Sequence, residues 1–255
     1  MQMYADKAKF DLDGFVLIED VVDAKDVIWM CEELSALDHP AGDRLHHGKT
    51  FAVRDVFAAS PPLLQFARSE ALAGLALTLL GSEAWPTKAT LFDKHADANW
   101  ALPLHQDLTI TVQARAEVPG FGPWTEKAGV PHVRPPEWVL QSTVALRIHL
   151  DDCPNENGAL HVVRASHRRG RLSTDALKAV MSDLASESVP ANAGDVLAMS
   201  PLTLHASGKS TNPNRRRVLH IEYASIDLPD PLRWPSWVAQ SEPSLYKHRM
   251  ENPVE

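Results

Sequence analysis

The stretch AGDVLAMSPLTLHASGKSTNPNRRRVLHIEYA, residues 193–224, decides how the second half of the chain folds. It contains two β-prone runs, at 195–199 and 217–223, separated by His205 and by turn-forming residues. Runs rich in β-branched and apolar residues that are bounded by turn signals are typical of strands. We therefore expect a β-rich region in which His205 lies close to the start of a strand.

A basic triplet, Arg215-Arg216-Arg217, opens the second of these runs. One interpretation is that the solvated charges protect the start of a strand at a sheet edge. The other is that an arginine points inward and binds a dicarboxylate, since the planar guanidinium holds a carboxylate by two hydrogen bonds. Neighbours on a strand alternate between faces, so either Arg216 alone or its two neighbours face inward.

A second motif, His105-Gln106-Asp107, lies at the edge of an alternating segment over 104–112. Residues i and i+2 of a strand share a face, so His105 and Asp107 project the same way and can take two adjacent positions on a metal. His205 is the best third ligand, and a site of two histidines and one carboxylate suits non-haem Fe(II). Without a third ligand, the motif would fit a surface ion pair.

Periodic patterns divide the chain into a helical part and a β-rich part with no linker between them. Apolar spacing and helix-start residues predict N-terminal helices over about 20–81, and short β-prone runs follow over about 85–225. Residues 113–138, rich in proline and aromatic residues, are predicted to form an ordered loop. We expect one domain over 1–255, mainly β with flanking helices.

Composition excludes several classes of function. The chain has 255 residues, of which 44% are hydrophobic and 23% charged, and its formal net charge is −8. This content allows a sizeable core, and the negative charge disfavours binding to nucleic acid or to an anionic membrane. We find no transmembrane run, no signal-peptide pattern and no disulfide framework in the sequence, which together predict a cytoplasmic protein.

Four stretches, taken together, resemble the phytanoyl-CoA dioxygenase family of Fe(II)- and 2-oxoglutarate-dependent oxygenases. They are DGFVLIEDVVD at 13–23, HQD at 105–107, LDDCPNENGALHVVRASHRRG at 150–170, and the stretch at 193–224. The resemblance covers the chain from about residue 10 to about residue 225. It implies a double-stranded β-helix, the cupin-like jelly roll, with Fe(II) as cofactor and 2-oxoglutarate and O2 as co-substrates.

The resemblance also implies a reaction. His105, Asp107 and His205 match the iron ligands, and we expect no catalytic residue beyond them. The implied enzyme is a dioxygenase of the EC 1.14.11 type that hydroxylates an unactivated C–H bond of a small-molecule metabolite and releases succinate and CO2. Related halogenases lack the carboxylate, so Asp107 argues for hydroxylation. Desaturation, epimerisation and ring closure use the same ligands and stay open.

Further residues match the family's co-substrate site. Arg216 matches the arginine that holds the distal carboxylate of 2-oxoglutarate, and Ser207 and Lys94 match groups that support the same co-substrate. Arg147 stands where many members have tryptophan, and alternation places Arg147 and His149 on the cavity face of their strand. A buried arginine must be paired. Arg147 could therefore contact 2-oxoglutarate, the substrate or an internal carboxylate, and His149 is a candidate substrate residue.

The aromatic segment 113–138 directly follows the first two predicted ligands. One hypothesis is a lid that places Phe121 or Trp124 against the substrate and keeps water from the reacting centre. In the alternative, the aromatic residues pack the segment onto the outside of the barrel as scaffold.

Two other classes of function remain possible. A cupin-like metalloenzyme that does not use 2-oxoglutarate would not require an arginine after His205. A non-catalytic jelly-roll binding module would have an incomplete or metal-free set of ligands. The sequence identifies neither the substrate nor the oligomeric state.

Overall fold

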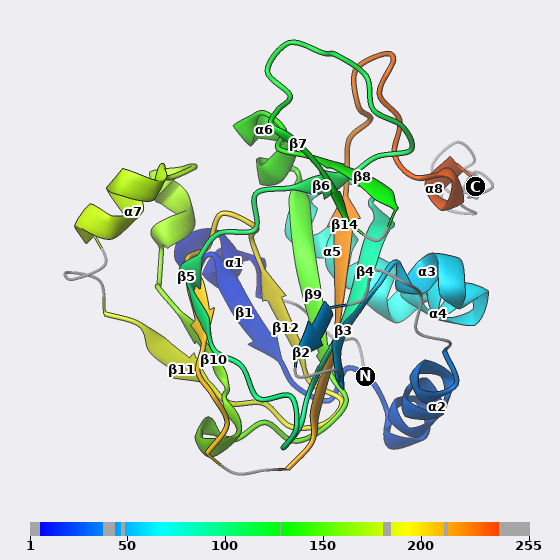
Figure 1. The fold of residues 1–255 in the computed structure, drawn as a ribbon, viewed down its shortest axis with the longest axis vertical. Coiled ribbons are helices and arrows are strands. Elements are labelled where there is room, and N and C mark those ends of the chain that lie inside the picture. The colour runs from blue at the N-terminus through cyan, green and yellow to red at the C-terminus, as the bar shows by residue number, and fades with distance from the viewer. Residues whose placement is uncertain are drawn as a thin grey trace, which may run out of the picture.

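The structure is organised around a main sheet of seven antiparallel strands in the order β1-β12-β9-β14-β4-β3-β2 (Figure 1). The computed structural model describes residues 6–37, 44–46, 49–127, 129–180, 185–211 and 214–239. The strands of the main sheet are β1 (Phe15–Ile18), β2 (Arg44–His46), β3 (Lys49–Arg54), β4 (Trp85–Lys94), β9 (Thr143–His149), β12 (Val196–Met199) and β14 (Arg216–Ala224).

A minor sheet of four strands, in the order β11-β10-β13-β5, packs against the main sheet. Its strands are β5 (Leu102–His105), β10 (Leu160–Val162), β11 (Glu187–Val189) and β13 (His205–Ser207). One hydrophobic cluster joins Leu197 and Met199 of the main sheet to Leu160, Val162 and Val189 of the minor sheet. Two antiparallel sheets packed face to face in this way form a double-stranded β-helix, or jelly roll, and confirm the predicted fold class.

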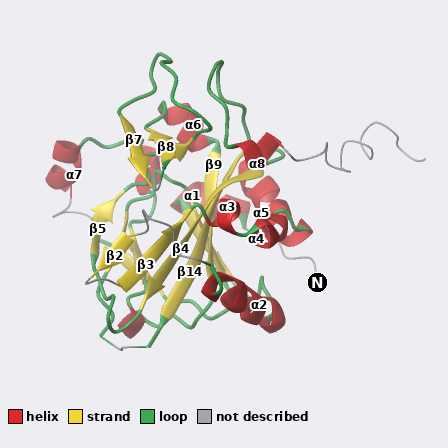
Figure 2. Cartoon of the chain, turned by 45° about the vertical axis from the view of Figure 1, so that its right-hand side comes forward, coloured by secondary structure: helices red, strands yellow, loops and turns green. Residues whose placement is uncertain are grey.

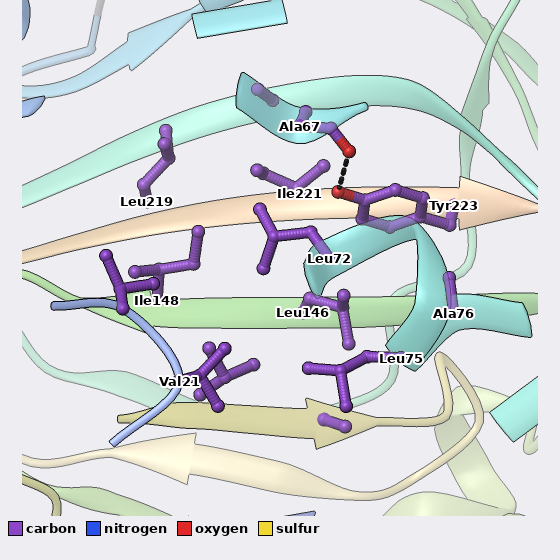
Figure 3. Close-up of a cluster of buried hydrophobic side chains, with 14 of the residues drawn as sticks. Val21, Ala67, Leu72, Leu75, Ala76, Leu146, Ile148, Leu219, Ile221 and Tyr223 are labelled. Atoms are coloured by element: carbon purple, nitrogen blue, oxygen red, sulfur yellow. Dashed lines mark hydrogen bonds between the residues drawn. The ribbon is translucent and has the colours of Figure 1, made fainter. Parts of the chain in front are cut away.

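Helices cover the other face of the main sheet (Figure 2). Alternate residues of β9 and β14 point toward them, and Leu146 and Ile221 pack with Leu72 and Leu75 (Figure 3). The Tyr223 hydroxyl donates a hydrogen bond to the Ala67 carbonyl at 2.8 Å. The described helices of the whole chain are α1 (Lys7–Asp13), α2 (Ala24–Ser35), α3 (Val56–Ala59), α4 (Pro61–Ala67), α5 (Glu70–Leu80), α6 (Glu137–Gln141), α7 (Thr174–Val180) and α8 (Ser236–Ala239), with 3-10 turns η1 (Asn155–Asn157) and η2 (Ser166–Arg169). Of these, α7 lies on the side of the minor sheet (Figure 1).

Local capping signals explain where the helices begin and end. The Asp23 side chain accepts from the Asp26 N–H at 2.9 Å at the start of α2. Ser60 accepts from the Leu63 N–H at 3.3 Å at the start of α4, with proline at the first helical position. Gly81, with φ of 75°, ends α5. These groups satisfy helix-end donors and acceptors that otherwise lack partners. The short helix α1 and the β2–β3 hairpin were not expected from the sequence.

The segment 113–138 is not a loop, and this prediction was wrong. It contains β7 (Trp124–Lys127) and β8 (Val130–Val133) and leads into the helix α6, and β6 (Ile110–Thr111) precedes it. The three strands form a small sheet in the order β6-β8-β7, which lies beyond one end of the main sheet (Figure 1). Strands this short show no clear alternation of their own, so they become evident only from the pairing of β8 with β6 on one side and with β7 on the other.

Among the described helices, none is by itself both long and apolar enough to cross a membrane. The adjoining helices α4 and α5 reach that length and composition only as a pair bent by 51°. Their side chains Leu63, Leu72 and Leu79 are buried in the core.

Candidate active site

Two histidines face each other on adjacent strands of the minor sheet. His105 ends β5, His205 begins β13, and the antiparallel register pairs these two residues directly. Their ring centroids are 4.1 Å apart. Asp107 lies just beyond β5, where its N–H donates to the Pro201 carbonyl at 2.9 Å and ties it to the segment that leads into β13.

These three side chains direct their ligand atoms into a common space. One ligand atom from each lies within 4.8 Å of the others. The Nε2 atoms of His105 and His205 are 3.7 Å and 3.6 Å from the Asp107 carboxylate oxygens. The two Nδ1 atoms contact the carbonyls of Pro103 at 2.8 Å and Thr203 at 2.9 Å. A carbonyl only accepts, so Nδ1 carries the proton in both rings and each Nε2 lone pair is available to a metal.

The charge states of Asp107 and His205 suit a divalent metal. Burial opposes ionisation of Asp107, but His205, His220, His105 and Lys88 outweigh it, and the pKa of Asp107 is lowered. Burial is also the largest influence on His205 and lowers its pKa to about 4, against the attraction of Asp107. At neutral pH the carboxylate is charged and the imidazole neutral, which is the state in which both bind metal.

Arg216 faces the barrel interior, and its two neighbours face away. The Arg216 side chain is buried. Arg215 pairs with Asp93 at 2.6 Å, and Arg217 pairs with Asp151 at 2.7 Å. This is the alternation that the sequence predicts for a strand, with Arg216 as the inward member.

Arg216, Lys94 and Ser207 converge on the backbone carbonyls of Gly158 and Gly208. Lys94 is the cross-strand neighbour of Arg216, and its Nζ donates to Ser207 Oγ at 3.2 Å and to the Gly208 carbonyl at 2.6 Å. Arg216 and Ser207 both donate to the Gly158 carbonyl. Gly158 has φ of 70°, and a Cβ there would lie 2.9 Å from the Gly208 oxygen, so glycine is needed for this close approach.

The paired cations Lys94 and Arg216 need a negative partner. Lys94 is 1% exposed and Arg216 is 3% exposed. No ion pair between described residues joins either of them to a carboxylate. Burial and then repulsion from Arg216 lower the pKa of Lys94 to about 7. Unpaired buried charge is costly, so this site favours a small anionic ligand.

Arg147 and His149 of β9 also face the interior, as alternation predicts. Arg147 is hydrogen-bonded to Nδ1 of His220 at 3.0 Å, so its partner within the described chain is a histidine and not the internal carboxylate considered above. Burial lowers the pKa of His149 to about 3. On this interior face, three buried nitrogens have no hydrogen-bond partner among the described residues: Arg147 Nε, His149 Nδ1 and Arg216 Nε. A dicarboxylate with several acceptor oxygens, such as 2-oxoglutarate, fits this set of donors.

Phe121 and Trp124 of segment 113–138 pack in a hydrophobic cluster. Phe121 is buried in a second hydrophobic cluster, and Trp124 packs against the same cluster. Trp124 pairs with Val133 across β7 and β8, whereas His132 belongs to the opposite face of the small sheet. This packing favours the scaffold interpretation for both aromatic residues, and their contact with substrate stays a prediction.

The opposite face of the small sheet brings other side chains toward the main sheet. Thr111, Lys127 and His132 line a cavity of about 10 Å³ together with Lys88 and Thr90 of β4. The sequence analysis did not single out these residues as site residues. Alternation was the available signal, because Lys88 and Thr90 share the face of Lys94.

Comparison with known proteins gives the chain a family and a fold. A family model described as Phytanoyl-CoA dioxygenase (PhyH) matches residues 10–218. No curated protein matches the chain. Among solved structures, the non-heme alpha-ketoglutarate-dependent epimerase SnoN from nogalamycin biosynthesis has a TM-score of 0.65 and 23% identity, covering 86% of this chain and 81% of that chain.

Two further structures share the fold. EctD from S. alaskensis with 2-oxoglutarate and 5-hydroxyectoine has a TM-score of 0.67 and 19% identity, covering 93% of this chain and 80% of that chain. HygX from Streptomyces hygroscopicus with nickel and 2-oxoglutarate has a TM-score of 0.60 and 20% identity, covering 87% of each chain. At such identities the likeness establishes a common fold, and residue roles depend on the geometry described above.

Proposed function

The chain belongs to the phytanoyl-CoA dioxygenase family, and from that premise we propose that it hydroxylates an unactivated C–H bond of a small-molecule metabolite. It is an Fe(II)- and 2-oxoglutarate-dependent dioxygenase. The observation that supports the proposal is the combination of a His-Asp-His ligand set with a buried cationic site in the same barrel.

The protein's own residues prepare the metal site. His105, Asp107 and His205 would hold Fe(II) from one side, which leaves positions for the co-substrate and O2. When bound, iron and 2-oxoglutarate would activate O2 for attack on an unactivated C–H bond, with one oxygen atom going to succinate, the other to the product, and CO2 released. The Nδ1 hydrogen bonds to Pro103 and Thr203 fix both rings before metal binds, which reduces the ordering cost of binding.

A second group of residues orients the co-substrate. Arg216, Lys94 and Ser207 would hold the distal carboxylate. The planar guanidinium of Arg216 would orient this carboxylate, and the ammonium of Lys94 would add positive charge beside it. Arg147 and His149 offer unpartnered nitrogens on the same interior face. Burial of these groups strengthens their interaction with an anion, because little water is present to screen it.

Epimerisation is the second candidate function, because SnoN shares this fold and is an epimerase. Isotopically labelled O2 separates the two. Hydroxylation places labelled oxygen in the product, whereas epimerisation leaves the product without it and exchanges hydrogen with solvent. Desaturation and ring closure each leave the product two hydrogens lighter, and they differ in whether a double bond or a ring is formed.

The deciding experiment is succinate formation by the iron-loaded protein, measured against a panel of small metabolites. We expect succinate to depend on iron, O2 and 2-oxoglutarate and to rise with one class of metabolite. Product formation without consumption of 2-oxoglutarate would support a cupin-like metalloenzyme. Absence of any metal-dependent turnover would support a non-catalytic binding module.

The environment of the reaction is also part of the proposal. We place the enzyme in the cytoplasm, acting on a free small molecule and not on nucleic acid or membrane. Both cysteines, Cys31 and Cys153, are free thiols, which suits a reducing compartment. The net charge of −8 opposes binding to polyanions. Cell fractionation and a nucleic-acid binding assay at low salt test these two statements.

The lid hypothesis for segment 113–138 has its own test, set against the scaffold interpretation that the packing of Phe121 and Trp124 favours. If Trp124 contacts substrate, Trp124→Ala should consume more 2-oxoglutarate than it forms product, because the substrate is held less firmly. A fully coupled Trp124→Ala variant with normal substrate affinity would establish the scaffold role instead.

A further inference from the structure

A line of four charged and polar side chains crosses the interior face of the main sheet. Arg147 of β9 is the cross-strand neighbour of His220 of β14, and Glu222 of β14 is the cross-strand neighbour of Lys88 of β4. Arg147 Nη1 is 3.0 Å from His220 Nδ1, and His220 Nε2 is 3.5 Å from Glu222 Oε1. The same Glu222 oxygen is 2.5 Å from Lys88 Nζ. The side chains therefore form a continuous relay from Arg147 to Lys88.

The hydrogen bonds of this relay have a defined direction. A guanidinium has donors only, so Nδ1 of His220 must accept from Arg147 and carries no proton. A neutral imidazole then carries its proton on Nε2, which faces the Glu222 carboxylate. Lys88 donates to the same carboxylate. Arg147 thus determines the tautomer of His220, and the Glu222 carboxylate accepts from both His220 and Lys88.

The relay is buried, so solvent cannot replace its contacts. Arg147, His220 and Glu222 are all buried, and the Lys88 side chain is largely covered. Burial would raise the pKa of Glu222, but Lys88 and His220 outweigh it and the pKa is lowered. Glu222 is therefore a carboxylate at neutral pH, and it holds His220 in the tautomer that Arg147 requires.

Arg147 is held from a second side by an aromatic ring. Its guanidinium carbon lies 5.7 Å from the centroid of the Phe92 ring, a distance typical of cation–π contacts. Phe92 also packs edge-on against the His220 ring, with centroids 6.0 Å apart. With both contacts made, Arg147 Nε remains without a partner among the described residues. The guanidinium is oriented but keeps a donor for a ligand.

We propose that Lys88, Glu222 and His220 are positioning residues that hold Arg147 so that its guanidinium binds one carboxylate of 2-oxoglutarate, while Arg216 and Lys94 bind the other. This inference rests on the proposed function. Arg147 and Arg216 repel each other across the interior, and a dianion between them relieves that repulsion.

The test measures binding of 2-oxoglutarate without turnover. Calorimetric titration of 2-oxoglutarate into the Ni(II)-loaded protein gives a dissociation constant for the wild type and for His220→Phe, His220→Asn and Arg147→Met. His220→Phe keeps a ring but removes the acceptor, and we expect binding to weaken about tenfold, since a hydrogen bond to a charged group is lost. His220→Asn keeps an acceptor near the Nδ1 position, and we expect most of the affinity to return.

A double variant shows whether His220 acts through Arg147. Adding His220→Phe to Arg147→Met should weaken binding no further, because the group being positioned is already absent. Glu222→Gln keeps an acceptor but loses the charge that holds Lys88, and we expect an intermediate effect. His161→Phe is the matched control, because His161 lies on β10 with its side chain opposite to the buried Leu160 and Val162, and its affinity should equal that of the wild type.

Each outcome has a defined meaning. Additive effects in the double variant, or unchanged affinity in His220→Phe, would overturn the positioning role. If His220→Phe does not fold, Glu222→Gln decides. Wild-type affinity in Glu222→Gln, or additive effects of Glu222→Gln and Arg147→Met, then overturns the proposal. Failure of the wild type to bind 2-oxoglutarate would instead refute the proposed function.

Discussion

The two faces of the main sheet carry opposite kinds of residue along the same strands. On β9, Leu146 and Ile148 pack under the helices, whereas Arg147 and His149 face the barrel. On β14, alternation likewise separates apolar residues from a polar row that begins with Arg216. Both faces are buried, so exposure to water does not explain the difference.

The difference lies in where each face finds its partners. Apolar side chains on the helical face are satisfied by other parts of the same chain, because dispersion and hydrophobic burial need no specific group. The barrel face instead holds cations and imidazoles with donors that have no partner among the described residues. The helical face is satisfied within the chain, whereas the barrel face keeps some donors that a ligand would satisfy.

The largest effect should follow from removing a metal ligand. His205→Ala leaves only His105 and Asp107 directed at the metal position. We expect Fe(II) binding to be lost and succinate formation to fall to the level of metal-free protein, while the circular dichroism spectrum stays that of a folded protein. His161→Ala is the control histidine. Retention of stoichiometric Fe(II) by His205→Ala would contradict the assigned ligand set.

A truncation on the helical face should affect stability and spare the site. Leu146 is fully buried against the helices, so Leu146→Ala should lower the free energy of unfolding by about 2–5 kcal/mol. Denaturant unfolding measures the loss, and 2-oxoglutarate affinity of the folded variant should be unchanged. Ile28→Ala, at a position 59% exposed on α2, should cost less than about 0.5 kcal/mol. A large loss of affinity in Leu146→Ala would show that the two faces are not independent.

Substitution of the inward Arg216 should weaken the binding of 2-oxoglutarate, whereas substitution of the outward Arg215 should not. Arg216→Lys keeps the charge but loses the planar fork, so 2-oxoglutarate affinity should fall on the order of ten- to a hundredfold, about 1.4–2.7 kcal/mol. Arg215→Lys changes an outward arginine paired with Asp93 and is the matched control. Steady-state kinetics with varied 2-oxoglutarate would measure both. Equal Michaelis constants for Arg216→Lys and the wild type would remove Arg216 from the site.

At neutral pH the smallest expected effect is that of His132, because its contribution to the pH dependence of stability appears only in acid. Burial is the main cause that lowers the pKa of His132 to about 4 from its ordinary value of 6.5. Between these values the unfolded chain binds a proton that the folded protein excludes, so His132 should reduce stability as pH falls from 6.5 toward 4. The free energy of unfolding should fall by on the order of 1 kcal/mol per pH unit in this window, and His132 makes no such contribution above it.

Urea unfolding of wild type and His132→Phe at several pH values isolates this contribution. The stability of the wild type relative to the variant should fall as the solution is acidified through that window. A constant difference would mean that His132 titrates normally and is more accessible to water than its packing indicates.

Much of the fold and the metal site could be predicted because their signals are local. The Ser60-Pro61 cap and the glycine at Gly81 mark helix ends within a few residues. The shared face of His105 and Asp107 follows from the period of a strand. The co-substrate residues Arg216, Ser207 and Lys94 came from resemblance to a family. Short strands in 113–138 were missed, because β7 and β8 are each only 4 residues long.

The sequence by itself determined which residues can share a face: Arg216 apart from its neighbours, and Arg147 with His149. Only the tertiary structure decided which faces meet. Three such meetings join residues far apart in the chain. The strand register pairs His205 with His105, and His220 becomes the partner of Arg147. One side of the small sheet faces β4. Alternation is a property of the local backbone, whereas register depends on the packing of the whole core, and a one-residue slip would turn every side chain to the other face.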